Sequence, residues 1–473
     1  MAFKVEFHKG IVKIELPDSP SMDDFTKIKK RLEDVEDISV VKVDLRKCSY
    51  IQSKVVSNII ALKKMLNEKK AKLILTNVQE GVMQLLEITN LINFVQIEKD
   101  FSSYSVDELA EFFIDPEVCD AVSDYIATHY NDEFRNKMFE LLNSDDPIFK
   151  EYAILTIGKA HDVTALDTIR HALNDEVGNV NKAAILVLGW MGDEESKEEI
   201  YSFLESDFID VAEAAAASIA LLSDEDDSHK LGEFLKSPDE RLRRIAIQAL
   251  TLINDDDSYN FLKNHVKNET SEMVRAILAK SLSFYNKAEV ADILLDLLKD
   301  ESLKVREAAA SSLIRINAKS KIGDILQRVT DEDSWVGYFA AKAIGELCRE
   351  KTCSDYLIKV YDRVEQNVKL AIVHALGNIG INCSDFLMGL MSDKNEDIRK
   401  EALEAIYKIE KEKAVEMAER ALDEDDNWVV RFKAVDILAN AKPSGYQDFL
   451  RSIYEKENNR YVKEKILSVL EGL

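Results

Sequence analysis

Residues 305–313 read Val305-Arg306-Glu307-Ala308-Ala309-Ala310-Ser311-Ser312-Leu313, and this pattern decides the fold. Its first residue, position i, is apolar; the next is basic, position i+4 is Ala and position i+8 is Leu. Offsets of 4 and 8 fall on one face of an α-helix. Eleven units share this register at spacings of 30 to 32 residues, with Ile or Leu at i+8 in all of them, Ala at i+4 in eight and often a basic residue at i+1, which indicates an internal repeat. Position i falls at Phe149, Val180, Val211, Leu242, Val274, Val305, Val336, Val368, Ile398, Val430 and Val462.

Each unit has the pattern of a helical hairpin. A second amphipathic segment precedes the stripe, as at 290–298, and an acidic turn such as Asp300-Glu301-Ser302 joins the two. A hairpin of this kind buries both faces only by stacking on its neighbours, so we predict an all-α solenoid of about eleven hairpins. The period and the V-R-x-x-A sequence pattern resemble those of HEAT-like repeats, including the repeats of phycobilisome-lyase proteins, over roughly residues 133–473.

The first hundred residues follow a different pattern. Short apolar runs at 3–7, 11–16, 40–45, 73–75 and 94–97 predict strands, and segments 22–32, 55–67 and 82–88 predict helices. This alternation predicts an α/β domain. We therefore expect an α/β domain over residues 1–100, a helical connector over 101–132 and the repeat solenoid over 133–473.

The α/β domain resembles the STAS domain of anti-sigma-factor antagonists. The resemblance lies in Val41-Lys42-Val43-Asp44-Leu45, followed by Cys48-Ser49-Tyr50-Ile51-Gln52-Ser53-Lys54 at the start of a helix, and it extends through Leu85-Leu86-Glu87-Ile88. In regulatory members of that family, a partner kinase phosphorylates the second Ser of this loop. The resemblance therefore implies an α/β docking module with a switch loop.

The switch loop of this chain departs from the family pattern. Gln52 stands at the family's Asp position, Ser53 matches the first Ser, and Lys54 occupies the acceptor position. Because Lys54 takes no stable phosphate from a serine kinase, the ordinary phosphoswitch is lost. Ser53 and Ser57 remain alternative acceptors, against the plainer interpretation of an N-cap and a solvated serine. We predict a protein-docking edge formed by Tyr50, Gln52, Ser53, Lys54 and Ser57.

Charge limits the class of partner. Residues 1–100 hold 17 Lys and Arg against 15 Asp and Glu, a net charge of +2. Because the whole chain carries −26, residues 101–473 carry −28. An acidic solenoid repels phosphate backbones and anionic lipids, which argues against nucleic acid and membrane surfaces and favours protein partners. The sequence shows neither a signal peptide nor a spanning segment, which predicts a cytoplasmic protein. We expect buried free thiols at Cys48, Cys119, Cys348, Cys353 and Cys383.

Two features of the repeats each allow two interpretations. The basic residue at i+1 either pairs with the acidic turns as a structural ladder, which we favour, or forms a cationic stripe; it is present as Lys150, Arg243, Arg275, Arg306, Lys369, Arg399, Arg431 and Lys463. The second feature is two pairs of aromatic residues, Trp335 with Tyr338 and Trp428 with Phe432, and the two members of each pair share one helix face. They either fill the seams between repeats or form a peptide-binding patch.

The sequence holds no catalytic or cofactor motif. Its seven His form no H-x-x-x-H or His-Glu pair, and there is no phosphate-binding loop or nucleophile elbow. We therefore predict a non-enzymatic bacterial signalling adaptor without a cofactor, whose STAS-like module docks a regulatory kinase or anti-sigma-like partner while the solenoid holds a second protein. Two alternatives stay open: a lyase or chaperone for a tetrapyrrole-like cofactor, and a structural subunit of a large complex.

Overall fold

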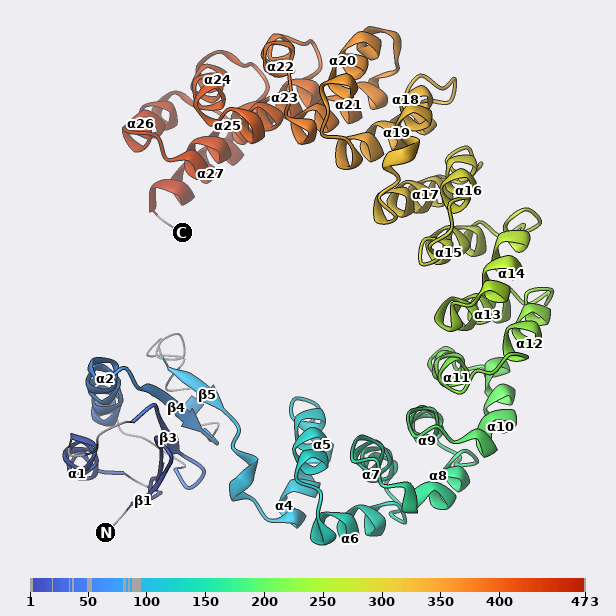
Figure 1. The fold of residues 1–473 in the computed structure, drawn as a ribbon. Coiled ribbons are helices and arrows are strands. Elements are labelled where there is room, and N and C mark those ends of the chain that lie inside the picture. Colours follow the sequence, from blue (N-terminus) through green and yellow to red (C-terminus); the bar gives the residue numbers. More distant parts are fainter. Residues whose placement is uncertain are drawn as a thin grey trace. The chain divides into compact units, whose positions relative to one another are not determined.

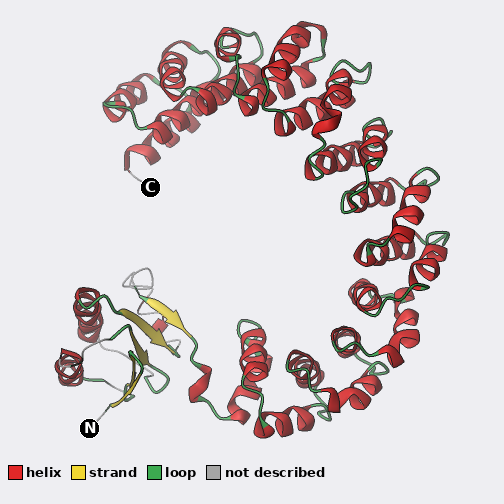
Figure 2. Cartoon of the chain, in the orientation of Figure 1, coloured by secondary structure: helices red, strands yellow, loops and turns green. Residues whose placement is uncertain are grey.

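The computed structural model describes residues 3–18, 20–33, 35, 38–48, 53–79, 82–83, 86 and 95–471. The chain divides into two compact units, Met1–Ala165 and Leu166–Leu473. In the described residues, strands occur in the first unit alone, and every regular element after residue 100 is helical (Figure 2). The sequence-based division at 100 and 132 remains a prediction.

A five-stranded sheet opens the first unit. Its strands lie in the order β1 (Lys4–His8), β2 (Ile11–Glu15), β3 (Val40–Asp44), β4 (Lys72–Thr76) and β5 (Gln96–Glu98). The first pair is antiparallel and the other pairs are parallel. Helices α1 (Met22–Glu33) and α2 (Ser53–Glu68) lie on the same side of the sheet (Figure 1). The predicted strands and these two helices are confirmed; most of the helix predicted at 82–88 lies outside the described residues.

The core of this sheet lies between its inner face and the two helices. Alternation along β2 places Val12 and Ile14 inward, and they are fully buried against Phe25 and Ile28 of α1. Lys13, between them, points to the opposite face and forms an ion pair with Asp100 at 3.0 Å. The period-2 pattern that predicted the strand therefore also determines which face is covered.

Two helices connect the sheet to the repeats. Helix α4 (Val106–Glu111) begins at a capping box, in which Ser105 and Glu108 exchange hydrogen bonds with each other's backbone N–H. Helix α5 (Cys119–Thr128) packs on α7 (Pro147–Lys159), and the Thr156 hydroxyl of α7 donates to Ser123 Oγ of α5 at 2.9 Å. These helices lie between the sheet and the first helical hairpin.

Eleven hairpins follow in the described residues, and the second helix of each begins two residues before position i of its unit. The pairs are α6 (Asp132–Leu141) with α7, α8 (Leu166–Ala172) with α9 (Gly178–Trp190), α10 (Lys197–Ser202) with α11 (Ile209–Leu221), α12 (Asp227–Phe234) with α13 (Glu240–Ile253), α14 (Asp256–Val266) with α15 (Glu272–Leu282), α16 (Val290–Leu297) with α17 (Leu303–Arg315), α18 (Ile322–Arg328) with α19 (Ser334–Leu347), α20 (Lys351–Val360) with α21 (Gln366–Ile379), α22 (Ser384–Leu390) with α23 (Glu396–Ile409), α24 (Lys411–Glu424) with α25 (Trp428–Ala441), and α26 (Tyr446–Lys456) with α27 (Arg460–Glu471).

The second unit has two layers of helices. The odd-numbered helices contact one another in succession from α9 to α27 and line the inner side of the curve of this unit (Figure 1). Small residues allow the closest approaches: a Cβ atom on Gly345 of α19 would lie 2.7 Å from the Cα atom of Ala375, and one on Gly377 of α21 would lie 2.9 Å from the Cα atom of Ala405. The predicted solenoid of about eleven hairpins is confirmed.

The cysteines correct one expectation. Cys48, Cys119 and Cys383 are buried free thiols, as predicted, but Cys348 and Cys353 form a disulfide across the turn from α19 to α20. Helix α19 ends at Leu347 and α20 begins at Lys351, so the tight turn brings the two Cα atoms to 6.6 Å, within the range that a disulfide spans. A separation of five residues carries no recognised pairing motif, and the turn geometry supplies the proximity.

Candidate functional site

The predicted docking edge falls largely outside the described residues. Tyr50 and Gln52 lie outside them entirely. The backbone of Ser53, Lys54 and Ser57 belongs to the first two turns of α2, whereas their side chains are not described. The docking edge therefore remains a prediction from the sequence.

The described residues around this edge form a fixed base. The Asp44 carboxylate, at the end of β3, accepts the backbone N–H of Arg46 at 2.9 Å and the side-chain amide of Asn77 at 3.2 Å. The Cys48 thiol donates to the carbonyl oxygen of Pro17 at 2.9 Å, and burial raises its pKa to about 12. A thiol with this pKa stays protonated at neutral pH, so Cys48 holds the loop and offers no reactive thiolate.

The basic row at i+1 forms a ladder between consecutive repeats. Arg243 donates from Nε and Nη2 to both carboxylate oxygens of Glu269, each at 2.9 Å, and Arg275 does the same to Asp300 at 2.7 and 2.9 Å. These are bidentate charge-assisted pairs, in which the planar guanidinium matches the carboxylate. Arg399 binds Asp425 and Arg431 binds Glu457 in the same bidentate way, whereas Arg306 donates to Asp333 through Nη2 alone.

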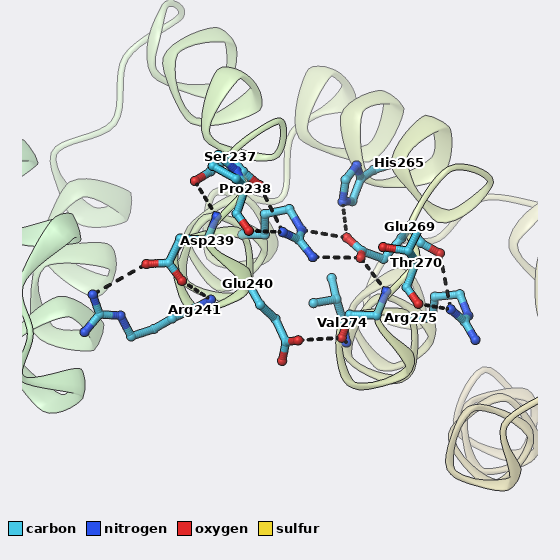
Figure 3. Close-up of polar contacts among 12 residues, drawn as sticks. Ser237, Pro238, Asp239, Glu240, Arg241, His265, Glu269, Thr270, Val274 and Arg275 are labelled. Atoms are coloured by element: carbon cyan, nitrogen blue, oxygen red, sulfur yellow. Dashed lines mark hydrogen bonds and ion pairs between the residues drawn. The ribbon is translucent and has the colours of Figure 1, made fainter.

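Each of these arginines also caps the turn that precedes its own helix. Arg275 donates from Nη1 to the carbonyl oxygen of Thr270 at 2.8 Å, and Arg243 donates to that of Ser237 at 2.9 Å (Figure 3 shows the turns at Thr270 and Ser237). The turn residue Glu269 therefore gives its carboxylate to Arg243 and its carbonyl oxygen to Arg275. Glu269 thus links two arginines, and such links form one continuous hydrogen-bond network along α13 to α17. The interpretation of the basic row as a structural ladder is confirmed for the arginines.

The arginine ladder is interrupted between α19 and α21. Gly337 occupies position i+1 of α19, where a Cβ atom would lie 2.7 Å from the carbonyl oxygen of Val329. In α21 the position is Lys369, whose Nζ lies 5.1 Å from the ring centroid of Tyr361. The arginine row thus splits into two ladders, one over α13 to α19 and one over α23 to α27.

Glu269 makes the first ladder sensitive to acid. Burial alone would raise its pKa, but hydrogen bonds from Arg243, the N–H of Ser271 and His265 outweigh burial and hold the pKa at about 2. Figure 3 shows His265 beside Glu269. Because the folded pKa lies below the ordinary value of 4.5, this carboxylate stabilises the fold fully above pH 4.5 and loses that contribution as the pH falls toward 2. The contribution amounts to roughly 3 kcal/mol.

We therefore expect the urea midpoint of the chain to fall steeply between pH 4.5 and pH 2.5, and Glu269→Gln to flatten that fall. The Gln variant starts less stable at pH 6 and has less to lose on acidification. Urea unfolding followed by circular dichroism at five pH values measures both. Parallel curves for the two proteins would show that Glu269 does not carry this acid sensitivity.

The two predicted aromatic pairs differ in the structure. Trp335 is 42% exposed at the start of α19, and its ring centroid lies 5.4 Å from that of Tyr338. Trp428 contacts Tyr461 of α27, also at 5.4 Å, while Lys465 lies over the ring of Phe432 at 5.5 Å. Helices α21 and α23 separate the two pairs, so they form two local clusters, and their role in peptide binding remains a prediction.

Two histidines of the described solenoid each lie beside a glutamate. His265 Nε2 lies 2.7 Å from Glu269, and His374 Nδ1 lies 2.7 Å from Glu401. In the described part of the chain, no group of three or more His, Cys, Asp or Glu is placed to hold a metal ion. None of the described helices combines the length and hydropathy needed to cross a membrane.

Comparison with protein families identifies both parts of the chain. A model described as HEAT repeats matches residues 135–220, 198–283, 228–314, 291–377, 354–439 and 384–471. The chain is a HEAT-repeat protein. A model described as the STAS domain matches residues 2–103 of this HEAT-repeat protein, which accounts for the sheet and for α1 and α2. The resemblances stated from the sequence are confirmed for both parts.

Solved structures similar to this HEAT-repeat protein include complexes of a karyopherin. Kap121p bound to the SUMO protease Ulp1p matches with a TM-score of 0.49 and 13% identity over 88% of this chain and 51% of that chain. Kap121p bound to Pho4p has a TM-score of 0.48 and 13% identity, with 88% and 52% covered. An engineered protein has a TM-score of 0.27 and 18% identity, with 71% and 97% covered. The chain spans about half the length of the karyopherin it matches, and no curated protein matches it.

Proposed function

We propose that this HEAT-repeat protein is a non-enzymatic bacterial signalling adaptor. The STAS domain docks a regulatory partner of the kinase or anti-sigma class through the edge from Tyr50 to Ser57, and the acidic solenoid holds a second protein. The observation that carries the proposal is the fusion of a STAS domain, matched over residues 2–103, to a HEAT solenoid matched over 135–471. A docking module joined to a long stacked surface places two proteins on one chain.

The chemistry of the described residues supports a role in binding. The N–H groups of the ladder arginines donate to neighbouring carboxylates and carbonyl oxygens, so these arginines form no cationic stripe that could bind a phosphate backbone. Meanwhile, Trp335 stands exposed in a chain whose residues after 100 carry −28. Exposed aromatic side chains are frequent anchors of protein interfaces.

Lys54 gives the docking edge a fixed positive charge at the start of α2, the position at which the family carries a phosphorylated serine. We expect Lys54→Glu to release the regulatory partner, because it replaces the cation by an anion of the kind that a phosphate would supply. The measurement is a pull-down from native lysate with the full chain as bait, read by mass spectrometry. Lys64→Glu, the same charge change on an exposed position of α2, is the matched control.

The outcomes separate the adaptor from its alternatives. Loss of a specific protein with Lys54→Glu and its retention with Lys64→Glu would support the docking edge. An unchanged set of proteins with both variants would remove that edge from the proposal. A full chain that retains no protein but carries a coloured small molecule would instead favour the lyase or chaperone for a tetrapyrrole-like cofactor.

A further inference from the structure

The inner face of the odd-numbered helices changes character along the second unit. Toward the C-terminus its charges pair across neighbouring helices, from position i+6 of one unit to i+3 of the next. The pairs are His374 with Glu401 at 2.7 Å, Glu404 with Lys433 at 3.0 Å and Asp436 with Lys465 at 2.7 Å. These side chains satisfy one another, and that half of the face needs no outside partner.

The N-terminal half of the same face is apolar and exposed. Position i+10 holds Trp190, Leu221, Leu252 and Phe284 in four consecutive units, and these side chains are 41%, 62%, 53% and 55% exposed. In the next four units the same position is polar: Arg315, Glu346, Asn378 and Lys408. Single exposed apolar residues are common on any protein, but four in one register form a continuous apolar row, which is typical of an interaction surface.

A groove accompanies this row between α11, α13 and α15. Its volume is about 260 Å³, and its lining is mainly apolar. Ile245 and Ile277, both at position i+3, lie in its wall, and Leu252 and Phe284 of the exposed row line it as well. The row and the groove therefore form one surface.

Arg244 places an unpaired cation in this apolar surface. The residue is half-buried; its Nε atom is buried and has no hydrogen-bond partner, and none of the ion pairs among the described residues includes its guanidinium. Glu213 also lines the groove without pairing to it. A buried N–H donor without an acceptor is costly, so a carboxylate brought by a bound molecule would be favoured here. Arg315 adds positive charge nearby, 4.6 Å from the Phe284 ring centroid.

We propose that this surface seats an amphipathic α-helix of a partner protein, with an acidic residue of that helix bound by Arg244. Packed helices lie about 8–10 Å apart, so the row presents one apolar side chain at each such interval. An α-helix rises about 10.5 Å in seven residues and returns to the same face. A β-strand covers that distance in about three residues. Because side chains alternate between the two faces of a strand, every second contacting side chain would point away from the row. The spacing therefore matches a helix of about 20 residues.

The inference rests on the proposed function, since it names the chemistry of the protein that the solenoid holds. Its test uses the full chain and a defined probe. The probe is a labelled 21-residue helical peptide with Leu at the a and d positions of three heptads, Glu at each e position and Lys elsewhere on the outside. A twin peptide carries Gln at the e positions. Three equivalent Glu residues bring one near Arg244 in any register.

We expect the Glu peptide to bind at least ten-fold more tightly than its Gln twin by fluorescence anisotropy. Arg244→Gln should abolish that preference, and Leu252→Glu should weaken both peptides at least ten-fold. Leu303→Glu is the matched control, because Leu303 is equally apolar and exposed but lies outside the row and the groove. Leu252 is exposed, so its substitution should leave the urea midpoint unchanged.

Three results would overturn the inference. They are no binding of the Glu peptide, binding that survives Leu252→Glu, and a preference for Glu that survives Arg244→Gln. A full-chain dimer that Leu252→Glu dissociates in sedimentation velocity would show that a second copy occupies the face, against the proposed partner helix. Failure of the peptide test leaves the Lys54→Glu experiment unaffected, so the two proposals can fail separately.

Discussion

Replacing Arg275 by alanine lowers the stability of the central repeats by about 3–5 kcal/mol, the expected cost of breaking a buried ion pair. Arg275 is 8% exposed, and its removal takes the arginine donors from the Thr270 carbonyl oxygen and from the Asp300 carboxylate, which keeps the backbone N–H of Ser302. Because a solenoid loses stability unit by unit, hydrogen exchange should rise first in α15 and α17. Urea unfolding together with hydrogen exchange by mass spectrometry measures the total loss and its location.

A surface pair supplies the control for this prediction. Arg451 contacts Asp448 at 2.9 Å with both side chains largely exposed, so Arg451→Ala should shift the unfolding free energy by less than about 0.5 kcal/mol. Arg275→Lys should fall between the two, since lysine keeps the charge but not the bidentate geometry. Equal losses for Arg275→Ala and Arg451→Ala would contradict a structural role for the ladder.

The repeat register made much of the solenoid predictable from the sequence. Every second helix begins two residues before position i, and the pairing of the basic residues at i+1 with acidic turns was predictable, as Arg306 with Asp333 shows. The hydrogen bonds from the arginines to backbone carbonyl oxygens were not predictable. Every residue carries a carbonyl oxygen, and the turn alone determines which one faces the arginine. The Cys348–Cys353 pair was missed for the same reason.

The groove was also missed, although the sequence carries its signal. Position i+10 lies beyond the buried stripe, and a single Leu or Phe there is unremarkable; only the comparison of Trp190, Leu221, Leu252 and Phe284 across units reveals a row. Arg244 looked like one more charge on an acidic chain, because its lack of an acceptor depends on the packing of three helices. For the docking edge around Lys54, the sequence remains the sole source.

Consecutive odd-numbered helices are held together by two kinds of contact, an arginine ion pair at i+1 or close packing at a glycine at i+9. A unit that lacks the first can have the second. Units with Arg at i+1, such as those of Arg275 and Arg399, have a larger residue than glycine at i+9. The unit of Gly337 lacks that arginine and carries Gly345 at i+9, where a Cβ atom would lie 2.7 Å from the Cα atom of Ala375 in α21. Where the ion pair is absent, close backbone packing takes over the contact.

We therefore expect Gly345→Ala to destabilise the chain by about 1–3 kcal/mol, and Gly345→Val to cost more, because the added atoms meet the backbone of Ala375. The control is Gly323→Ala in α18, where nothing lies within 4 Å of the new Cβ atom. There alanine should stabilise by up to about 1 kcal/mol, since it is the better helix former. Urea midpoints of the two variants should thus move in opposite directions. If both rose, the close packing of α19 on α21 would not be what holds the interrupted part of the ladder.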